Sequence, residues 1–312
     1  MDSAEISQQS NNFERSKNRE GKIDHHSLAI ATITFYPGWY PGDATQTGDL
    51  TSKVRGDIGL QILKEAKEKG YQVVVVDGGS SDAFKAELAS IGITPQLQLE
   101  KGYSAARQQS YREASNLDGV RVILSTEAEK LSAIHDCLTD KVIQPVLKGE
   151  TDIIIFKRDG EAFSTYPKDQ AEYEQKANKL WNDIMRKHNL LPPSAEDLDV
   201  WFGPRLIRND PHIISLFLNK YEFEKRGKLD QIVDPFVYAN ALFFPITIAL
   251  RDGLRVSSAV VPYRHPSSQT QMENESIEFR RIRDIQYKNI IVATMHLVRL
   301  LENNPKSKLT KI

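Results

Sequence analysis

Apolar residues along the chain fall into two patterns, short unbroken runs and stretches in which they recur every four positions. The run from Leu28 to Tyr36 predicts a strand, and Pro37 with the glycine-rich turn after it predicts its end. The stretch from 50 to 66 predicts a helix that ends near Gly70, because a spacing of four puts its apolar residues on one face. Those residues are Leu50, Val54, Ile58, Ile62 and Ala66.

The two patterns then alternate over the first half of the chain. Val73 to Val76 is a run of four valines, which is typical of a parallel strand buried on both faces. Further strands are predicted at Pro95–Leu99, Val120–Leu124 and Asp152–Phe156, and helices from about Ser81, at Tyr103–Ser115, at Leu131–Leu147 and from about Glu275. This alternation predicts an α/β fold with a mostly parallel, Rossmann-like central sheet flanked by helices. After Lys157 the pattern becomes mainly helical, so we expect a helical C-terminal half.

Composition narrows the class of protein. The chain has 312 residues, a formal net charge of −1 and 40% hydrophobic residues, typical of a soluble globular protein without the basic excess of nucleic-acid binders. Cys137 is the single cysteine, so intrachain disulfides are excluded and a cytoplasmic location is expected. No apolar run approaches the roughly 18 residues of a membrane span. The first 27 residues are polar and predict a disordered extension, followed by one domain over residues 28–312.

Polar residues that could bind a ligand or act in catalysis follow the predicted strands, at the sheet edge where ligands bind in this class of fold. Asp77 comes directly after the valine run and could accept hydrogen bonds from a base or a ribose. Gly78 and Gly79 would let another group approach the backbone closely. The alternative is a plain strand-to-helix turn in which Ser80 or Ser81 caps the next helix.

The next helix opens with Gly102 and carries Arg107 near its first turns. An arginine there can grip a carboxylate or a diphosphate with two parallel hydrogen bonds. A solvated or salt-bridged helix face would explain the same residue.

Glu127 and Glu129 stand one residue apart just after a predicted strand, so in an extended segment both would face the same side. Two such carboxylates repel unless a cation lies between them, and Mg²⁺ or Mn²⁺ bridging to substrate phosphates would meet that need. A helix N-terminus, where acids are favoured, is the alternative. His265, in the non-helical stretch YRHP, could be a third metal ligand or an ordinary loop histidine.

The order of these pieces is more informative than any one of them. VVVVDGGSSD, GYSAARQQSYREA, VILSTEAEK, FGPR and YRHP follow one another between Leu28 and His265 as in the glycosyltransferases with the GT-A fold, especially the family 2-like group, which this chain resembles. The resemblance implies a nucleotide-binding half at about 28–157 and an acceptor and metal-completing half at about 158–312. Asp77 matches the nucleotide-contacting acid, and Gly102 and Arg107 match the helix motif. Glu127 and Glu129 occupy the Asp-x-Asp position, with glutamate in both places.

The resemblance implies a role for each matching residue. Donor or nucleotide contacts are expected from Tyr36, Pro37, Asp77, Gly78, Gly102, Arg107, Thr126 and Glu127. Metal ligands are expected in Glu127, Glu129 and His265, with the His265 ring facing Glu129 across the cleft, and contacts to sugar or acceptor in Trp201, Gly203 and Arg205. If the reaction inverts configuration, Asp199 or Asp234 could deprotonate the acceptor.

The leading hypothesis is therefore a glycosyltransferase that moves a sugar from a nucleotide-diphosphate donor to a hydroxyl of a small molecule or glycan, assisted by Mg²⁺ or Mn²⁺. A sugar-phosphate nucleotidyltransferase is the first alternative, although YPGWYPGD after the first strand lacks the basic residue such enzymes carry there. A catalytically silent nucleotide-sugar-binding homologue is the second, favoured by the Glu-for-Asp changes. The apolar residues of the terminal helix predict packing on the protein's own sheet in preference to a homo-oligomer interface.

Overall fold

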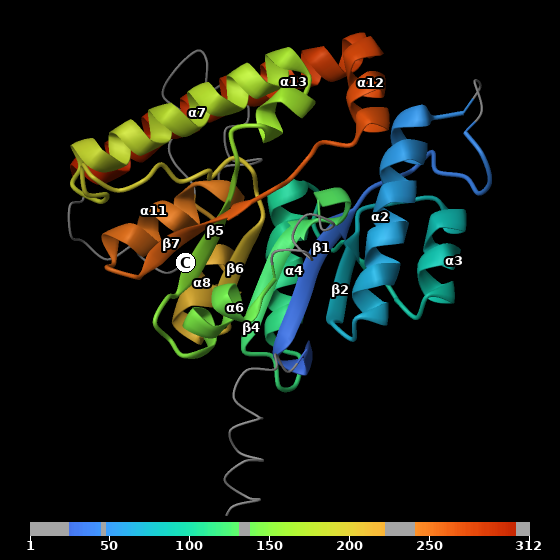
Figure 1. Ribbon diagram of the computed structural model, residues 1–312, viewed down its shortest axis with the longest axis horizontal. Coiled ribbons are helices and arrows are strands. Elements are labelled where there is room, and N and C mark those ends of the chain that lie inside the picture. Colours follow the sequence, from blue (N-terminus) through green and yellow to red (C-terminus); the bar gives the residue numbers. More distant parts are fainter. Residues whose placement is uncertain (1–24, 45–47, 131–137, 222–240, 304–312) are drawn as a thin grey trace, which may run out of the picture.

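One mixed sheet of seven strands, flanked by helices, organises the computed structural model, which describes residues 25–44, 48–130, 138–221 and 241–303 (Figure 1). The strand order across the sheet is β3-β2-β1-β4-β6-β5-β7. The strands are β1 (Leu28–Thr34), β2 (Gln72–Asp77), β3 (Gln96–Leu97), β4 (Val122–Glu127), β5 (Ile153–Arg158), β6 (Arg205–Arg208) and β7 (Val256–Val261).

All of these strands except β6 run in the same direction. β1 pairs in parallel with β2 and β4, so that Ile33 lies opposite Val76 on one side and Glu127 on the other. β6 lies antiparallel between β4 and β5, and β7 pairs in parallel with β5. The carboxyl ends of β1, β2 and β4 therefore meet at one edge of the sheet, which is where this class of fold binds ligands.

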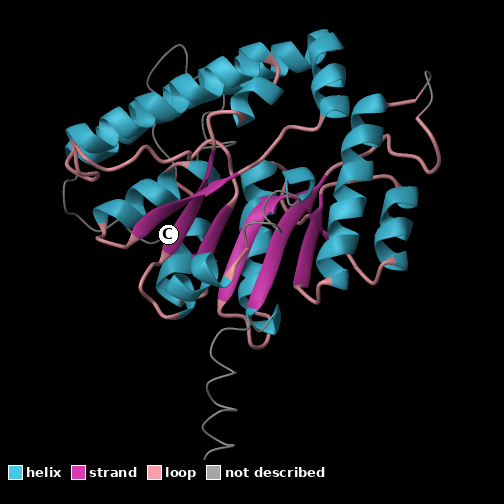
Figure 2. Ribbon diagram, viewed as in Figure 1, coloured by secondary structure: helices cyan, strands magenta, loops and turns pink. Residues whose placement is uncertain are grey.

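Helices cover both faces of this sheet (Figure 2). The α-helices are α2 (Leu50–Glu68), α3 (Asp82–Ser90), α4 (Tyr103–Ser115), α6 (Asp140–Leu147), α7 (Lys168–Lys187), α8 (Pro211–Leu218), α11 (Phe244–Arg251), α12 (Ser267–Glu275) and α13 (Ile277–Asn303). Three short 3₁₀ helices are η1 (His25–Ser27), η2 (Ala128–Lys130) and η3 (Ala162–Thr165). The fold is thus the α/β arrangement with a largely parallel central sheet that the sequence predicts.

The sheet is apolar on both faces because alternate residues of each strand point to opposite sides. In β1, Ala29 and Ala31 belong to the hydrophobic cluster that includes α4, α8 and α11. Leu28 and Ile30 of the same strand belong to the opposite cluster, which includes α2 and α6. Burial on both faces explains why the strands read as unbroken apolar runs in the sequence.

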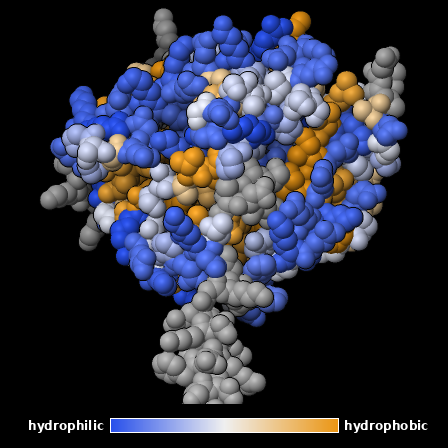
Figure 3. All heavy atoms as spheres, viewed as in Figure 1, coloured by the Kyte–Doolittle hydropathy of each residue, from blue (hydrophilic) through white to orange (hydrophobic). Residues whose placement is uncertain are grey.

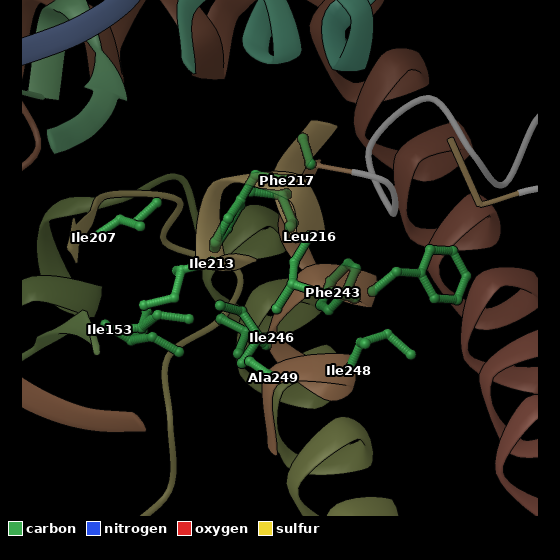
Figure 4. Packing of buried hydrophobic residues seen from close by; sticks show 14 of the residues in the cluster. Ile153, Ile207, Ile213, Leu216, Phe217, Phe243, Ile246, Ile248 and Ala249 are labelled. Carbon is green, nitrogen blue, oxygen red and sulfur yellow. The ribbon is translucent and has the colours of Figure 1, made fainter. Parts of the chain in front are cut away.

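The core around β5 and β6 is built largely by two short helices of the second half of the chain (Figure 4). Ile213 and Phe217 of α8 and Ile246 of α11 are fully buried, in the same cluster as Ile153 and Ile207 of the sheet. The apolar segment Ala241 to Ala249 is therefore part of the core.

α7 and α13 lie side by side as an outer layer over this core (Figure 1). Tyr173 stacks on Tyr287 with ring centroids 4.7 Å apart, and Trp181 is buried beneath. Ile290 and Leu297 of α13 are buried in the core, while Figure 3 shows hydrophilic residues over the outward side of the layer. Ile290, Val292, Leu297 and Leu301 of the terminal helix therefore pack within the chain, where α7 is one partner. Ile277, Ile282, Ile285 and Met295 of the same helix are exposed.

The main differences from the predicted elements lie in the second half, where the sequence analysis missed β6 and β7. Both complete the central sheet, so the C-terminal half is not simply helical. β4 extends three residues beyond the predicted Leu124, to Glu127, which makes Glu127 a strand residue. Of the helix predicted over 131–147, the described part is α6, and residues 131–137 with Cys137 lie outside the described residues. No helix in the described ranges is long and apolar enough to cross a membrane.

Candidate functional site

The candidate site lies at the carboxyl ends of β1, β2 and β4. Register places Asp77 beside Thr34 on one side of β1 and Glu127 beside Ile33 on the other. Glu129 follows in the 3₁₀ turn η2, directly after β4. The two motifs that the sequence analysis singled out thus flank the end of the same central strand.

The Asp77 turn is held by its own side chain. The buried carboxylate accepts hydrogen bonds from the Thr34 hydroxyl at 2.9 Å and from the backbone N–H groups of Gly79 at 3.1 Å and Ser80 at 3.0 Å. Ser81 caps α3 by accepting from the Phe84 N–H at 3.2 Å. Asp77 therefore fixes the shape of the turn, as the strand-to-helix alternative predicts, and the direct contact with a nucleotide stays a prediction.

An exposed apolar surface lies beside this turn, which the sequence analysis did not anticipate. Phe35 is 63% exposed, and a Cβ added at Gly78 or Gly79 would lie 3.4 or 3.8 Å from its ring. Leu97 and Leu99, on and just after β3, are 73% and 74% exposed. We call these three side chains the apolar shelf. Large apolar groups left exposed at a sheet edge are typical of a surface that a ligand covers.

Glu127 belongs to a closed cluster of polar groups. Its Oε1 accepts hydrogen bonds from the Tyr103 hydroxyl and from Arg107 Nη2, each at 2.5 Å, and Lys130 Nζ lies 3.3 Å from its Oε2. Arg107 also donates to the Ser125 hydroxyl at 2.6 Å. The Arg107 side chain is only 1% exposed. It therefore neutralises Glu127 inside the protein, and in this arrangement it does not present its guanidinium to a diphosphate.

Burial would raise the pKa of Glu127, but the Arg107 charge outweighs it, so the pKa lies well below the usual range for a glutamate. The pKa of the Tyr103 hydroxyl is raised, first by burial and also by the negative charge of Glu127. The cluster is therefore an ionised carboxylate held by an arginine and a neutral tyrosine.

The FGPR segment packs against this cluster. Gly203 has a φ of +94°, and a Cβ there would lie 3.2 Å from both carboxylate oxygens of Glu127, so this backbone approach suits glycine. Arg205 is buried and donates to the carbonyls of Gly203, Ala241 and Leu242 at 3.0 to 3.2 Å. Trp201 packs on Phe243 with ring centroids 5.7 Å apart. The segment lies near the site as expected, but Arg205 serves the backbone in this structure.

Glu129 has an equivalent set of partners on the outer side of the site. Its Oε1 accepts from Arg55 Nε at 2.8 Å and from Arg55 Nη2, and its Oε2 accepts from the Tyr36 hydroxyl at 2.9 Å. Burial would raise the pKa of Glu129, but the Arg55 charge lowers it below the ordinary value. The Glu129 side chain is 4% exposed, whereas that of Arg55 is 36% exposed. Tyr36 is buried, so it frames the site by orienting Glu129.

His265 is buried in a polar pocket of its own. Its Nδ1 lies 2.8 Å from the Thr270 hydroxyl, its Nε2 lies 3.5 Å from Glu273 Oε2, and its ring packs on Tyr166 with centroids 4.4 Å apart. Burial, followed by the charges of Lys130 and Arg283, lowers the pKa of His265 to about 3, so the ring is neutral. A hollow of about 560 Å³ borders it, lined also by Thr165 and Asn274.

The metal site expected at Glu127, Glu129 and His265 stays a prediction, and its three side chains have other partners in this structure. No group of three or more His, Cys, Asp or Glu side chains that could hold a metal ion occurs among the described residues. Glu127 is engaged by Arg107, Glu129 by Arg55, and the ring nitrogens of His265 by Thr270 and Glu273 on α12. The three side chains therefore do not fit a shared metal ion in this arrangement. No pattern in the sequence indicates that Arg55 and Glu273 would be the partners.

The two candidate bases differ in what the structure describes. Asp199 is buried and accepts from Arg158 Nε at 2.8 Å and Nη2 at 2.9 Å, and from Asn178 Nδ2 at 2.6 Å. Burial would raise the pKa of Asp199, but the Arg158 charge holds it below the ordinary value, which suits a structural ion pair better than a base. Asp234 lies outside the described residues.

The remaining predicted contact residues lie at the same edge of the sheet or next to it. Gly102 is the N-cap of α4, with a φ of +112°. Its carbonyl accepts from Gln98 Nε2 at 2.9 Å, which ties the helix to the strand-end loop beside the apolar shelf. Pro37 is exposed, three residues after the end of β1. Thr126 is fully buried within β4, so its side chain is not open to a ligand.

Solved structures with a similar arrangement are glycosyltransferases. Glucosyl-3-phosphoglycerate synthase from Mycobacterium tuberculosis, in complex with Mn²⁺, UDP and phosphoglyceric acid, superposes with a TM-score of 0.51 at 10% identity, over 88% of this chain and 78% of that chain. The chain has the GT-A fold. The complex of the same enzyme with UDP gives a TM-score of 0.50 at 10% identity, over 88% of this chain and 80% of that one.

A further GT-A neighbour is mannosyl-3-phosphoglycerate synthase from Rubrobacter xylanophilus, with a TM-score of 0.47 and 13% identity over 92% of this chain and 77% of that chain. No family model matches the sequence, and no curated protein matches it. The fold predicted from the order of the motifs is thus confirmed by shape, at an identity too low to carry residue roles across.

Proposed function

We propose that this protein is a glycosyltransferase that uses a nucleotide-diphosphate sugar as donor. The observation that carries the proposal is the placement, in a GT-A sheet, of the Asp77 turn and the Glu127–Glu129 segment on either side of the end of β1. This edge is where α/β folds of this kind bind nucleotides. The apolar shelf beside the Asp77 turn offers the same edge a surface for a base.

The structural neighbours support a particular class of substrate. The synthase from M. tuberculosis was solved with UDP, Mn²⁺ and phosphoglyceric acid. By analogy, the donor proposed here is a sugar attached to a nucleoside diphosphate such as UDP, and the acceptor a small hydroxylated molecule or a glycan. The sugar would pass to an acceptor hydroxyl, and the nucleoside diphosphate would leave.

In this proposal the nucleoside base stacks on Phe35. The ring is 63% exposed and lies beside Gly79, where a Cβ would meet only the Phe35 ring, at 3.8 Å. At Gly78 the space is taken by Gln98 Oε1, which would lie 2.6 Å from a Cβ. Asp77 acts as a positioning residue, because its carboxylate accepts hydrogen bonds from Thr34 and from the backbone of the turn and so holds these glycines in place. The backbone of the turn would then contact the base or ribose.

Mg²⁺ or Mn²⁺ stays part of the proposal as cofactor. Bound to the donor, such an ion would neutralise the diphosphate leaving group. The cationic side chains at this edge are Arg55 on Glu129 and Lys130 beside Glu127. Because the acids already have protein cations as partners, the arrangement described assigns no ligand set to the ion. The cytoplasmic location also stays a prediction from the sequence, and homo-oligomer formation stays the less favoured alternative.

The test is calorimetric binding of a panel of nucleoside diphosphates and their sugars, with and without Mn²⁺. Phe35→Ala should weaken binding of the preferred nucleotide by roughly tenfold or more, as stacking on an aromatic ring is worth about 1–3 kcal/mol per base. Leu180→Ala is the matched control, since Leu180 is an exposed apolar residue (39%) on α7 of the outer layer. Absence of binding to every nucleotide in the panel would remove the proposal.

The two alternatives have outcomes of their own. Pyrophosphate release from a nucleoside triphosphate and a sugar phosphate would identify a nucleotidyltransferase instead. The silent homologue is favoured by one observation, the pairing of both glutamates with arginines inside the protein. Nucleotide binding without transfer to any acceptor, together with equal Mn²⁺ affinity of the wild type and Glu129→Gln, would identify it.

A further inference from the structure

A polar hollow of about 230 Å³ lies where the N-terminal end of α7 meets the corner between α12 and α13 (Figure 1). We call it the corner hollow. Lys168 and Gln170 of α7, Glu273 of α12, and Arg280 and Arg283 of α13 are among the residues that line it. One water molecule needs only about 10–15 Å³ of such a volume, so the corner hollow has room for a small organic molecule. None of its lining residues belongs to β1, β2 or β4 or to the turns after them, so it is separate from that edge of the sheet.

The cations that line the corner hollow have few partners in the protein. Lys168 and Arg280 are exposed, and within the described residues neither has an ion-pair partner. Arg283 is partly buried, and its Nε has no hydrogen-bond partner among the described residues. The acids of the lining are Asp169 and Glu273, so three cations face two acids. Free guanidinium and ammonium donors of this kind favour an anionic group, with which they form charge-assisted hydrogen bonds.

The N-terminal end of α7 adds to this positive character. The helix is 20 residues long, and its N-cap is Pro167, so no side chain caps the first turn. The first N–H groups of a helix have no partner within it and carry the positive end of the helix dipole. An anion in the corner hollow would therefore meet a helix end as well as the cationic side chains.

Two buried acceptors of the lining lack a donor. Gln170 is 4% exposed, and its Nε2 donates to Glu174 Oε1 at 2.8 Å while its Oε1 has no hydrogen-bond partner. Glu273 is 1% exposed, and its Oε1 accepts from Gln269 Nε2 at 2.8 Å. Its Oε2 has no hydrogen-bond partner, with His265 Nε2 3.5 Å away. Because a buried acceptor without a donor costs stability, a ligand that fits this hollow must bring donors, such as hydroxyl groups, as well as its negative charge.

We propose that the corner hollow binds a small anion that also carries hydroxyl groups, of the class of a phosphorylated polyol. The anionic group would lie against Lys168, Arg280, the Nε of Arg283 and the first turn of α7. The hydroxyl groups would donate to Gln170 Oε1 and Glu273 Oε2. A bound ligand would tie α7 to the corner between α12 and α13 and stabilise the folded protein. Binding at this place does not depend on the proposed function.

Calorimetry with inorganic phosphate, glycerol and glycerol 3-phosphate tests both parts of this recognition. The wild type should bind glycerol 3-phosphate at least about fivefold more tightly than phosphate and should not bind glycerol, because only glycerol 3-phosphate offers the charge and the hydroxyl donors together. Lys168→Gln/Arg280→Gln should weaken glycerol 3-phosphate binding roughly tenfold or more, since hydrogen bonds to charged groups are the strong ones. Lys176→Gln/Arg299→Gln is the matched control, because it removes two exposed cations from the same helices that do not line the hollow. It should leave binding unchanged.

Gln170→Met separates recognition of the hydroxyl groups from recognition of the charge. It removes the free acceptor at a similar side-chain length, so phosphate affinity should stay the same and glycerol 3-phosphate should lose its advantage over phosphate. Melting temperatures with and without glycerol 3-phosphate report folding and binding together, and the ligand should raise that of the wild type. If Gln170→Met does not fold, the two exposed double variants still decide the outcome.

Three results would overturn the proposal. The first is no binding of glycerol 3-phosphate to the wild type at millimolar concentration. The second is equal affinity of the wild type and Lys168→Gln/Arg280→Gln for glycerol 3-phosphate, which would mean that the ligand lies elsewhere. The third is equal affinity of the wild type for phosphate and glycerol 3-phosphate, which would mean that the free acceptors take no part.

The Phe35→Ala variant keeps the corner hollow distinct from the proposed donor site. It should weaken nucleotide binding and leave glycerol 3-phosphate binding unchanged. A loss of glycerol 3-phosphate binding in Phe35→Ala would place the ligand at the sheet edge beside the apolar shelf and would also overturn the proposal. If no nucleotide binds to the wild type, the proposed function fails, while the glycerol 3-phosphate measurements still decide whether the corner hollow is a binding site.

Discussion

The two glutamates of the candidate site have the same kinds of partner and very different surroundings. Glu127 and Glu129 each bind one arginine and one tyrosine hydroxyl. We call the Glu127 cluster, with Tyr103, Arg107 and Gly203, the closed side, and the Glu129 cluster, with Tyr36 and Arg55, the open side. The arginine is 1% exposed on the closed side and 36% exposed on the open side.

Because the two arginines differ in exposure, Glu127 is suited to a structural role and Glu129 to a chemical one, although they lie in one short segment. An ion pair whose arginine is buried holds elements together, and removing one partner leaves the other charge uncompensated. An ion pair whose arginine reaches in from the surface can exchange partners at lower cost. The closed side therefore anchors β4 to α4 and to the FGPR segment, and the open side joins η2 to α2 through an arginine that reaches the surface.

The largest effect should come from removing the arginine of each side in turn. Arg107→Met removes the buried guanidinium that neutralises Glu127, whose side chain is 14% exposed, and should lower the free energy of unfolding by about 3–5 kcal/mol. Arg55→Met should lower the free energy of unfolding by only about 1–2 kcal/mol, because water can enter the space that the partly exposed guanidinium leaves beside Glu129. Urea unfolding measures both. Equal losses would show that the open side is as rigid as the closed one, and Arg107→Met/Glu127→Met should recover part of the larger loss.

A smaller effect is expected where the backbone touches the closed side. Gly203→Ala forces an L-residue to a φ of +94° and pushes its methyl group to 3.2 Å from the carboxylate oxygens of Glu127. We expect a loss of about 2 kcal/mol in unfolding free energy, since such a backbone costs about 1–2 kcal/mol before any contact. Gly253→Ala is the control, because Gly253 has a φ of +78° with open space around it. If both variants lose the same amount, the contact with Glu127 contributes nothing.

The smallest expected effect is a change with pH in the free energy of unfolding, caused by His265 in its polar pocket. The pKa of His265 is about 3 in the folded protein and about 6.5 in the unfolded chain, so below pH 6.5 the unfolded chain takes up a proton that the folded protein does not. His265 thus contributes stability above pH 6.5 and loses it as the pH falls, by about 1 kcal/mol between pH 7 and 5.5. Lys130 and Arg283 oppose the imidazolium, and Glu129, Glu174 and Glu273 favour it.

The measurement compares unfolding free energies of the wild type and His265→Gln at pH 7 and 5.5. Burial raises the pKa of Glu273, a shift opposite in sign to that of His265, so its effect on the pH dependence of stability is opposite too. The difference between wild type and variant isolates the histidine from that effect. A wild type that loses no more stability than the variant would mean that the ring is already charged, or open to water, at neutral pH.

Local sequence predicted the parts of the fold that local patterns encode. The valine run gave β2, the four-residue spacing gave α2, and Asp77 and Glu127 fell at the sheet edge where strand ends must meet. β6 and β7 were missed because RLIR carries arginine at both ends and VSSAVV carries two serines. Their strand character comes from the neighbours they pair with, which no short window contains.

The sequence predicted where the site residues lie along the fold, but not which side chains they contact. Nothing near Glu129 in the sequence indicates that Arg55, 74 residues earlier, will bind it. Arg55 follows Val54 in a helix whose apolar stripe was easy to recognise, and such arginines are usually solvated. Glu273 lies in a polar helix, where burial is the exception. Both assignments depend on how α2 and α12 are placed on the sheet, so they become visible only in the folded chain.

The reversed strand β6 has a consequence for how the protein is made. Synthesis completes β4 and β5 before Arg205–Arg208 exists, and β6 is the strand that lies between them. Until it arrives, each of the two strands has a bare edge of unpaired N–H and C=O groups in the middle of the future sheet. The nascent chain therefore carries its greatest risk of pairing with a neighbour while residues 159–204 emerge. That interval ends when the four-residue strand β6 pairs with both β4 and β5.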